Sequence, residues 1–267
     1  MNWMKKVAVA LVCLLPLGLQ AAKVDTLQVK SPSMNKSIEV VVVSPDVAAT
    51  KACPVIYLLH GYGGNARTWV GIKPDLSKIA DEKGIFFVCP DGKNTWYWDS
   101  PLNADVRYET FISNELVKYV DSHYKTVADR KGRAITGLSM GGHGAMWNGL
   151  RHSDVFSAAG STSGGVDIRP FPKNWEMSVQ IGEKAKYPEN WEKYTVINLV
   201  PTLRKDQIAL IFDCGDSDFF LEVNKNYHEA LLKQGIDHDF ITRPGSHNSI
   251  DYQILFFWKH FLKMKAL

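Results

Sequence analysis

Cysteine is scarce in this sequence of 267 residues, and no two cysteines stand at a metal-binding spacing. The four cysteines are Cys13, Cys53, Cys89 and Cys214, and no pair of them forms the C-x-x-C pattern of a zinc site. The cysteines therefore indicate no metal site. Three cysteines follow the N-terminal leader described below, and an odd number leaves at least one unpaired. We expect all three to be small buried side chains.

Charge of one sign is not in excess either. The chain has 31 Lys and Arg against 28 Asp and Glu, which gives a formal net charge of +3 at pH 7. This balance gives no electrostatic reason to expect binding to nucleic acid or to an anionic membrane. With 45% hydrophobic residues, the chain suits one domain with a full core, and no second domain is required.

The start of the chain, residues 1–22, has the pattern of a secretory signal peptide. Lys5 and Lys6 form its basic start, residues 7–19 its apolar stretch, and Ala21 and Ala22 its small-residue exit. The apolar stretch is too short for a comfortable membrane span. We therefore predict cleavage after Ala21 or Ala22, a single mature domain of residues 23–267, and a secreted or periplasmic location. No stable membrane insertion is expected after signal removal, and an uncleaved N-terminal anchor is the alternative.

Apolar runs of strand length alternate with helical patterns along the rest of the chain. The expected strands are 24–30, 37–43, 55–59, 85–88, 133–136, 156–160, 208–212 and 239–242. Residues 105–124 form a helical pattern, with Tyr108, Ile112, Leu116 and Val120 on one face at four-residue spacing. Strands that alternate with helices predict an α/β fold, with a mainly parallel sheet covered by helices on both faces. The two leading strands are expected to be antiparallel.

The most informative motif is Gly137-Leu138-Ser139-Met140-Gly141. It follows an expected strand and opens a helical run, which is the context that a G-x-S-x-G nucleophile elbow needs. A sharp turn there lifts the serine hydroxyl above the sheet, and the crowded backbone leaves no room for side chains at the two glycines. We therefore predict that Ser139 is a catalytic nucleophile.

Candidates for the acid and the base lie downstream in the order that an α/β-hydrolase requires. Asp218 follows the expected strand 208–212, and His247 follows the expected strand 239–242 in a Gly-Ser loop. A serine hydroxyl needs an imidazole to take its proton, and the imidazole needs a carboxylate to fix its tautomer. His247 is our candidate base and Asp218 our candidate acid, with Asp213 and Asp216 as alternatives for the acid.

A glycine-rich loop, residues 60–64, follows the expected strand 55–59. In this fold one backbone donor to a developing oxyanion comes from such a loop, and the other comes from the residue after the nucleophile. We assign these two donors to the backbone N–H groups of Tyr62 and Met140.

These motifs together resemble the esterase D family of α/β-hydrolases, which includes feruloyl, acetyl-xylan and tributyrin esterases and S-formylglutathione hydrolases. The resemblance rests on LHGYGG at 59–64, YETFI at 108–112, GLSMGG at 137–142, CGDSD at 214–218 and PGSH at 244–247. It extends from about residue 40 to the end of the chain. It implies an α/β-hydrolase fold with Ser139 as nucleophile, Asp218 as acid and His247 as base.

Two aromatic segments are candidates for substrate binding. Residues 164–206 interrupt the alternation with prolines and aromatic side chains, Trp175 among them, and we interpret them as a cap-like insertion. The alternative is a packed insert whose aromatic residues form their own small core. Trp96 and Trp98 lie in a loop after the expected strand 85–88, where their rings could stack on a substrate or merely fix the loop to the body.

The sequence therefore predicts a secreted serine esterase that works through an acyl-enzyme and needs no metal or cofactor. Export and the family resemblance favour a feruloyl or acetyl ester of a carbohydrate, so the expected partner is a small-molecule or polysaccharide ester. The alternatives are a general short-chain lipid esterase, an acyltransferase, and a non-catalytic binding protein on a hydrolase scaffold.

Overall fold

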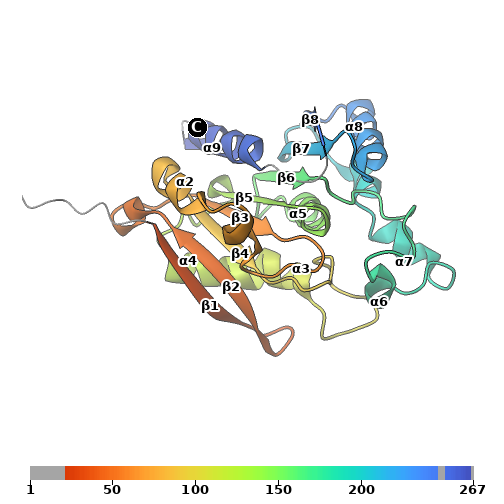
Figure 1. Cartoon of the computed structure of the whole chain (residues 1–267), viewed down its shortest axis with the longest axis horizontal. Coiled ribbons are helices and arrows are strands. Elements are labelled where there is room, and N and C mark those ends of the chain that lie inside the picture. Colours follow the sequence, from red (N-terminus) through yellow and green to blue (C-terminus); the bar gives the residue numbers. More distant parts are fainter. Residues whose placement is uncertain (1–21, 246–249, 266–267) are drawn as a thin grey trace, which may run out of the picture.

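One sheet of eight strands organises the part of the chain that the computed structural model describes, residues 22–245 and 250–265. Its order is β1-β2-β4-β3-β5-β6-β7-β8 (Figure 1). The first three strands in this order pair antiparallel, and all later pairs are parallel. The strands are β1 (Lys23–Ser31), β2 (Lys36–Ser44), β3 (Val55–Leu59), β4 (Phe86–Pro90), β5 (Arg133–Gly137), β6 (Ala158–Thr162), β7 (Ala209–Gly215) and β8 (Asp239–Arg243).

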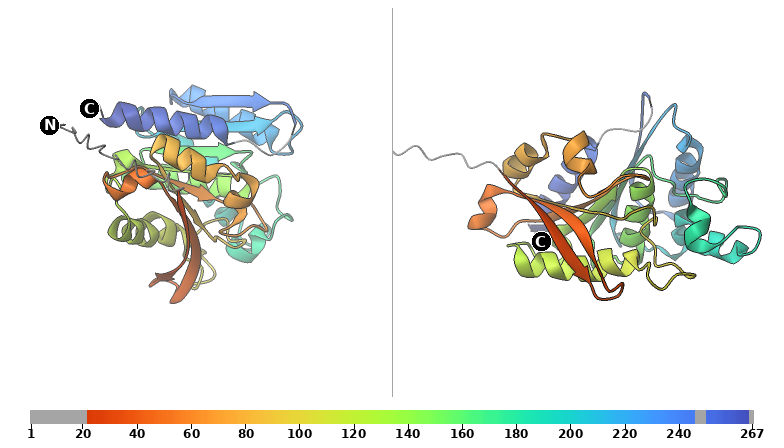
Figure 2. Two further views of the ribbon diagram at one scale, coloured as in Figure 1. Left: turned by 60° about the vertical axis from the view of Figure 1, so that its left-hand side comes forward. Right: turned by 60° about the horizontal axis from the view of Figure 1, so that its bottom comes forward.

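Helices cover both faces of this sheet, and each face has its own hydrophobic core (Figure 2). One core involves α1 (Thr68–Ile72), α2 (Leu76–Lys83) and α9 (Asp251–Lys265), and the other involves α3 (Tyr108–Thr110), α4 (Val117–His123), α5 (Met140–Arg151) and α8 (Leu221–Gln234). Side chains alternate between the faces of a strand. In β3, Ile56 and Leu58 therefore join the first core, while Val55, Tyr57 and Leu59 join the second.

The predicted α/β-hydrolase fold is confirmed, and the expected strands match the observed ones within a few residues. The expected helix 105–124 is observed as α3 and α4 joined by a π-helical turn, Phe111–Leu116. The four residues placed on one face by their spacing are buried: Tyr108, Ile112, Leu116 and Val120. The wider π-helical turn adds Phe111 and Ser113 to the buried set.

The segment 164–206 leaves the end of β6 and returns to the start of β7. It holds α6 (Met177–Ile181), α7 (Pro188–Lys193) and a 3₁₀ turn, Val196–Thr202, and Figure 1 shows α6 and α7 at the right of the molecule. Trp191 is fully buried and donates a hydrogen bond to the carbonyl of Gly182, at 2.9 Å. Trp175, in contrast, is half-buried. The buried side chains of the insert, Trp191 among them, join the hydrophobic core on the α5 and α8 face of the sheet, and the insert also leaves an aromatic ring accessible.

The predicted signal peptide lies outside the described residues except for Ala22. The backbone nitrogen of Ala22 donates a hydrogen bond to Oδ2 of Asp81 on α2, at 2.8 Å. Cleavage and export stay predictions. Among the described residues, no helix has both the length and the apolar character that a membrane span needs.

The three cysteines beyond the leader, Cys53, Cys89 and Cys214, are buried and unpaired, as the sequence predicts. Burial raises the pKa of each thiol, and that of Cys214 rises to about 12. The thiols are therefore small core side chains in their protonated form.

Candidate active site

Ser139 occupies a strained turn between β5 and α5. Its backbone has φ 57° and ψ −113°, a region that residues with a side chain rarely adopt and that costs about 1–3 kcal/mol. Hydrogen bonds to neighbouring segments hold this conformation in place. The Ser139 N–H donates to the carbonyl of Thr162 on β6, at 2.9 Å, and the Ser139 carbonyl accepts from the N–H of His143, at 3.0 Å. The turn thus presents the serine side chain at the carboxyl end of the parallel strands.

The glycines on either side of Ser139 let three backbone segments meet. A Cβ atom on Gly137 would lie 2.4 Å from the carbonyl oxygen of Gly141, and one on Gly141 would lie 2.2 Å from that of Leu59. Both distances are far below van der Waals contact. The sequence-based explanation of these glycines therefore agrees with the packing around the turn.

We expect Gly141→Ala to destabilise the protein by more than about 3 kcal/mol, because the clash is with backbone that has no free direction to move. The matched control is Gly71→Ala in α1, where a new Cβ meets nothing within 4 Å. This control is expected to leave stability unchanged or to raise it by a few tenths of a kcal/mol. Urea unfolding of the two variants tests the prediction, and equal midpoints would contradict it.

The glycine-rich loop after β3 lies directly beside Ser139. A Cβ built on Gly61 would come 3.6 Å from Cβ of Ser139. Within the described residues, the N–H groups of Tyr62 and Met140 have no hydrogen-bond acceptor. Met140 begins α5, where unpaired N–H groups and the helix dipole favour negative charge. Both groups are therefore suited to the predicted oxyanion contact.

The three aspartates considered for the acid differ sharply in environment. Asp218 lies in the loop between β7 and α8, is 7% exposed, and its Oδ1 accepts from the N–H of Phe220 at 2.8 Å. Asp216 is exposed and accepts from the N–H of Gly245 at 3.0 Å. Asp218 is thus a largely buried carboxylate at the carboxyl end of the sheet, whereas Asp216 belongs to a surface turn.

Asp213 belongs to a buried polar network within the sheet. It pairs with Arg243 of β8, with Nε to Oδ1 at 2.9 Å, and accepts from Gln253 of α9 at 2.6 Å and from Thr162 at 3.1 Å. Burial raises the pKa of its carboxyl group, against the lowering effect of Gln253 and Arg243. These partners occupy Asp213 and leave it unsuited to orient a catalytic imidazole.

His247, the candidate base, lies outside the described residues. His143 is the histidine nearest to Ser139 in sequence, and it is fully buried on α5. Its Nδ1–H donates to the carbonyl of Gly165 at 2.8 Å, and its Nε2 accepts from the indole of Trp98 at 2.8 Å. Burial lowers the pKa of His143 to about 4. His143 is therefore a neutral structural side chain.

The burial of Trp96 and Trp98 favours the second interpretation of these residues, that their rings fix the loop to the body rather than stack on a substrate. Their side chains are only 1% and 0% exposed, so neither ring offers a face to a ligand. The two indoles stack on each other, and the indole N–H of Trp96 donates to the carbonyl of Trp175 at 3.1 Å. Bulky rings that fill the space between loop and body are more stable buried than exposed, and here they fix the loop in place.

Trp175 differs from these two residues, because it keeps an accessible surface. Its ring stacks on Phe219, with centroids 5.3 Å apart and planes 26° from parallel. Phe219 follows Asp218 directly and is 56% exposed. The pair forms an aromatic surface next to the candidate acid, so Trp175 remains the candidate for substrate binding.

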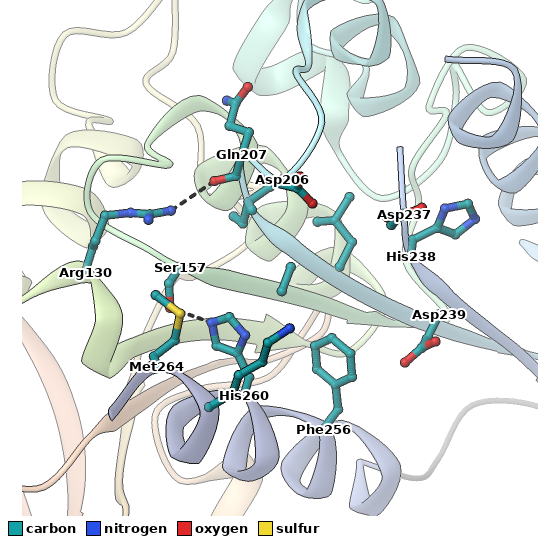
Figure 3. Close-up of a pocket in the computed structure, with 14 residues that line it drawn as sticks. Arg130, Ser157, Asp206, Gln207, Asp237, His238, Asp239, Phe256, His260 and Met264 are labelled. Atoms are coloured by element: carbon teal, nitrogen blue, oxygen red, sulfur yellow. Dashed lines mark hydrogen bonds between the residues drawn. The ribbon is translucent and has the colours of Figure 1, made fainter. Parts of the chain in front are cut away.

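A hollow of about 570 Å³ lies at the other end of the parallel strands from Ser139 (Figure 3). Ser157, Ile208 and Asp239, at the amino ends of β6, β7 and β8, contribute to its lining. Two pairs of its polar groups are in contact: Arg130 donates to the carbonyl of Gln207 at 2.9 Å, and His260 lies 3.0 Å from the hydroxyl of Ser157. Ligands of open α/β sheets bind at the carboxyl ends of the strands, so this hollow is not the candidate active site.

Sequence reasoning did not find two residues that contact the site loops. Thr162 holds the Ser139 backbone, and Asn94 accepts a hydrogen bond from the N–H of Gly63, at 2.8 Å. A polar residue in the loop after a strand's carboxyl end is the signal that could have indicated Asn94. In the part of the chain with described coordinates, no group of three or more His, Cys, Asp or Glu residues could hold a metal ion.

A mainly parallel sheet with a strained serine between a central strand and the next helix is the architecture of an α/β-hydrolase of the serine esterase class. A family model described as "Putative esterase" matches residues 31–261, and the chain therefore belongs to this esterase family. It is a serine esterase that acts on small-molecule esters.

Individual relatives agree with this assignment. The chain is 26% identical over 211 residues to an acetyl esterase of Caldicellulosiruptor saccharolyticus, covering 72% of this chain and 76% of that one. It is 26% identical over 250 residues to Esterase Rv1288 of Mycobacterium tuberculosis, covering 82% of this chain but 54% of the relative's length. A solved ferulic acid esterase is similar in structure, with a TM-score of 0.73 and 28% identity, covering 92% of this chain and 98% of that one.

Proposed function

We propose that the protein is an exported serine esterase that cleaves feruloyl or acetyl esters of carbohydrates. Ser139 is the nucleophile, His247 the base, Asp218 the acid, and the N–H groups of Tyr62 and Met140 hold the oxyanion. The observation that carries the catalytic part is the strained Ser139 beside two N–H groups that have no acceptor within the described structure. Unused donors next to a strained nucleophile are what a preorganised oxyanion site requires.

The reaction proceeds in two halves. Oγ of Ser139 attacks the ester carbonyl carbon while His247 takes the hydroxyl proton, and the carbonyl oxygen becomes an oxyanion. The bond to the alcohol oxygen then breaks, His247 returns the proton to the leaving alcohol, and an acyl-enzyme remains. Water repeats the sequence, with His247 again as base, and releases the carboxylic acid and the free serine.

The aromatic surface of Trp175 and Phe219 supports an aromatic acyl group as one substrate. A flat ring stacked on such a pair gains about 0.5–1.5 kcal/mol beyond its burial. Relatives named as a ferulic acid esterase and an acetyl esterase support the same choice of acyl groups. The predicted signal peptide supports a substrate outside the cytoplasm.

A substrate comparison tests this choice. We expect Trp175→Ala to lower kcat/KM for methyl ferulate up to about tenfold relative to ethyl acetate, since the feruloyl group has a ring that can stack on the aromatic surface and ethyl acetate has none. Tyr119→Ala on α4 is the matched control, because its ring stacks on His123 and is remote from the site. If Trp175→Ala changed both substrates equally, or if neither feruloyl nor acetyl esters were hydrolysed, the proposed substrate class would be wrong.

A further inference from the structure

Residues 60–64 form a tight turn whose first peptide is fixed by a buried histidine. The N–H of Gly64 donates to the carbonyl of Gly61 at 3.0 Å, and Gly63 has φ +75°, which together define a type II turn. His60 is buried and donates from Nδ1 to the same Gly61 carbonyl at 2.7 Å. In a trans peptide the C=O and the N–H point in opposite directions. These bonds therefore hold the Tyr62 N–H on the side away from His60.

The central peptide of the same turn is fixed by Asn94. Oδ1 of Asn94 accepts from the N–H of Gly63 at 2.8 Å, and Nδ2 of Asn94 donates to Oε2 of Glu176 at 3.3 Å. A backbone N–H can only donate and a carboxylate can only accept, so the amide orientation of Asn94 follows from its two neighbours. The Asn94 side chain thus joins the turn at 60–64 to the insertion at 164–206.

Where the insertion contacts the loop around Asn94, the backbone is strained on both sides. Trp96 and Tyr97 have φ of 58° and 60°, and Trp175 and Glu176 have φ of 48° and 53°. Each such residue costs about 1–3 kcal/mol and persists only where the surroundings enforce it. A hydrogen bond from the indole of Trp96 to the carbonyl of Trp175, at 3.1 Å, is part of that enforcement. Strain gathered at one junction, beside the candidate active site, indicates a functional requirement for this geometry.

We propose that Asn94 is a positioning residue of the oxyanion hole, and that Glu176 of the insertion keeps it in the working orientation. This inference rests on the proposed role of the Tyr62 N–H. Without the Asn94 amide, the central peptide of the turn loses the acceptor that holds it and can flip, as the difference between type I and type II turns allows. A flip shifts Tyr62 and the donor it contributes, and a displacement of about 1 Å in a reacting geometry can cost up to about a hundredfold in rate.

Kinetics of Asn94→Ala test the proposal, with p-nitrophenyl acetate as substrate. We expect kcat to fall about tenfold or more with KM within about twofold, because an oxyanion donor acts on the transition state rather than on the bound ester. Asn103→Ala is the matched control. Asn103 lies further along the same loop region, and its Oδ1 also accepts a backbone hydrogen bond, from Asp105 at 3.0 Å. The control is expected to keep the wild-type kcat.

Substitutions that exchange the amide of Asn94 and the carboxylate of Glu176 separate a positioning role from a general loss of structure. Asn94→Asp keeps the acceptor for the Gly63 N–H but sets a second carboxylate against Glu176, so we expect kcat to fall about tenfold. Glu176→Gln keeps an acceptor for the Asn94 amide and is expected to stay within about threefold of wild type. In the double variant N94D/E176Q, the introduced amide can donate to the introduced carboxylate, and kcat is expected to recover to within about threefold of wild type.

Besides a pure effect on KM, two results would overturn the proposal. One is a wild-type kcat in Asn94→Ala, and the other is a double variant no faster than Asn94→Asp alone. Neither result would affect the proposed nucleophile, since that depends on whether wild-type protein turns over esters and Ser139→Ala does not. A fall in activity that appears only as a raised KM would make Asn94 a substrate-binding residue and would likewise contradict a positioning role.

Discussion

Ser139→Ala is expected to lower kcat/KM for p-nitrophenyl acetate by roughly 10⁶-fold, the scale seen when a catalytic serine is removed from a hydrolase. The residual rate would come from the oxyanion donors and substrate binding, which do not depend on the hydroxyl. The fold is expected to survive, because the turn is held by backbone bonds to Thr162 and His143 and by the close approach of Gly141 to Leu59. Steady-state kinetics and a thermal unfolding curve on the same preparation measure both effects.

A fluorophosphonate probe provides the control for this result. Wild-type protein is expected to be labelled covalently at one site, and Ser139→Ala is expected to remain unlabelled while its unfolding temperature stays within about 2 °C of wild type. Labelling of the variant, or activity within tenfold of wild type, would contradict Ser139 as nucleophile. A folded wild-type protein that is neither labelled nor active would contradict the whole catalytic proposal.

Asp218→Asn is expected to cut kcat by roughly 10⁴-fold, because an amide in place of the carboxylate stabilises the wrong imidazole tautomer and cannot stabilise the imidazolium. The substitution preserves shape, and the new side-chain oxygen can still accept from the N–H of Phe220. Stability at pH 7 should therefore change little compared with the loss of rate. Steady-state kinetics with p-nitrophenyl acetate, together with urea unfolding, separate the two quantities.

The neighbouring aspartates supply the comparison for this variant. Asp216→Asn is expected to stay within about threefold of the wild-type rate, because an exposed carboxylate in a surface turn contributes little. Asp213→Asn is expected to lose about 1–3 kcal/mol of stability, because a neutral amide replaces the buried carboxylate that Arg243, Gln253 and Thr162 contact. Full activity in Asp218→Asn, with a large loss of rate in Asp216→Asn, would move the acid to Asp216.

The positions of the strands could be predicted from the sequence. The parallel strands are covered on both faces, and their residues therefore form unbroken apolar runs. The run at 55–59 was placed without error, since all five side chains from Val55 to Leu59 are buried. The helix expected at 105–124 was right in extent but not in geometry. Four-residue spacing does not distinguish a regular α-helix from one with an inserted π-helical turn, because both bury the residues of that spacing.

Some residues of the candidate site could also be predicted from the sequence, but for a different reason. The glycines around Ser139 are dictated by backbone contacts below 3 Å, so they mark the turn in the sequence itself. Two interpretations of Trp96 and Trp98 stayed open in the sequence, because sequence alone does not show whether an aromatic ring in a loop covers a ligand or fills the interior. Asn94 was missed because its role depends on Gly63 and Glu176, which lie about 30 and 80 residues away in the chain and meet it only in the fold.

The hydrogen bond from the Ala22 nitrogen to Asp81 gives the two predicted cleavage positions different consequences. A cut after Ala21 would turn this amide nitrogen into a free ammonium group that faces a carboxylate, so that maturation itself would fasten the first strand to α2. A cut after Ala22 would remove the donor and leave Lys23 to begin the edge of the sheet without that tether.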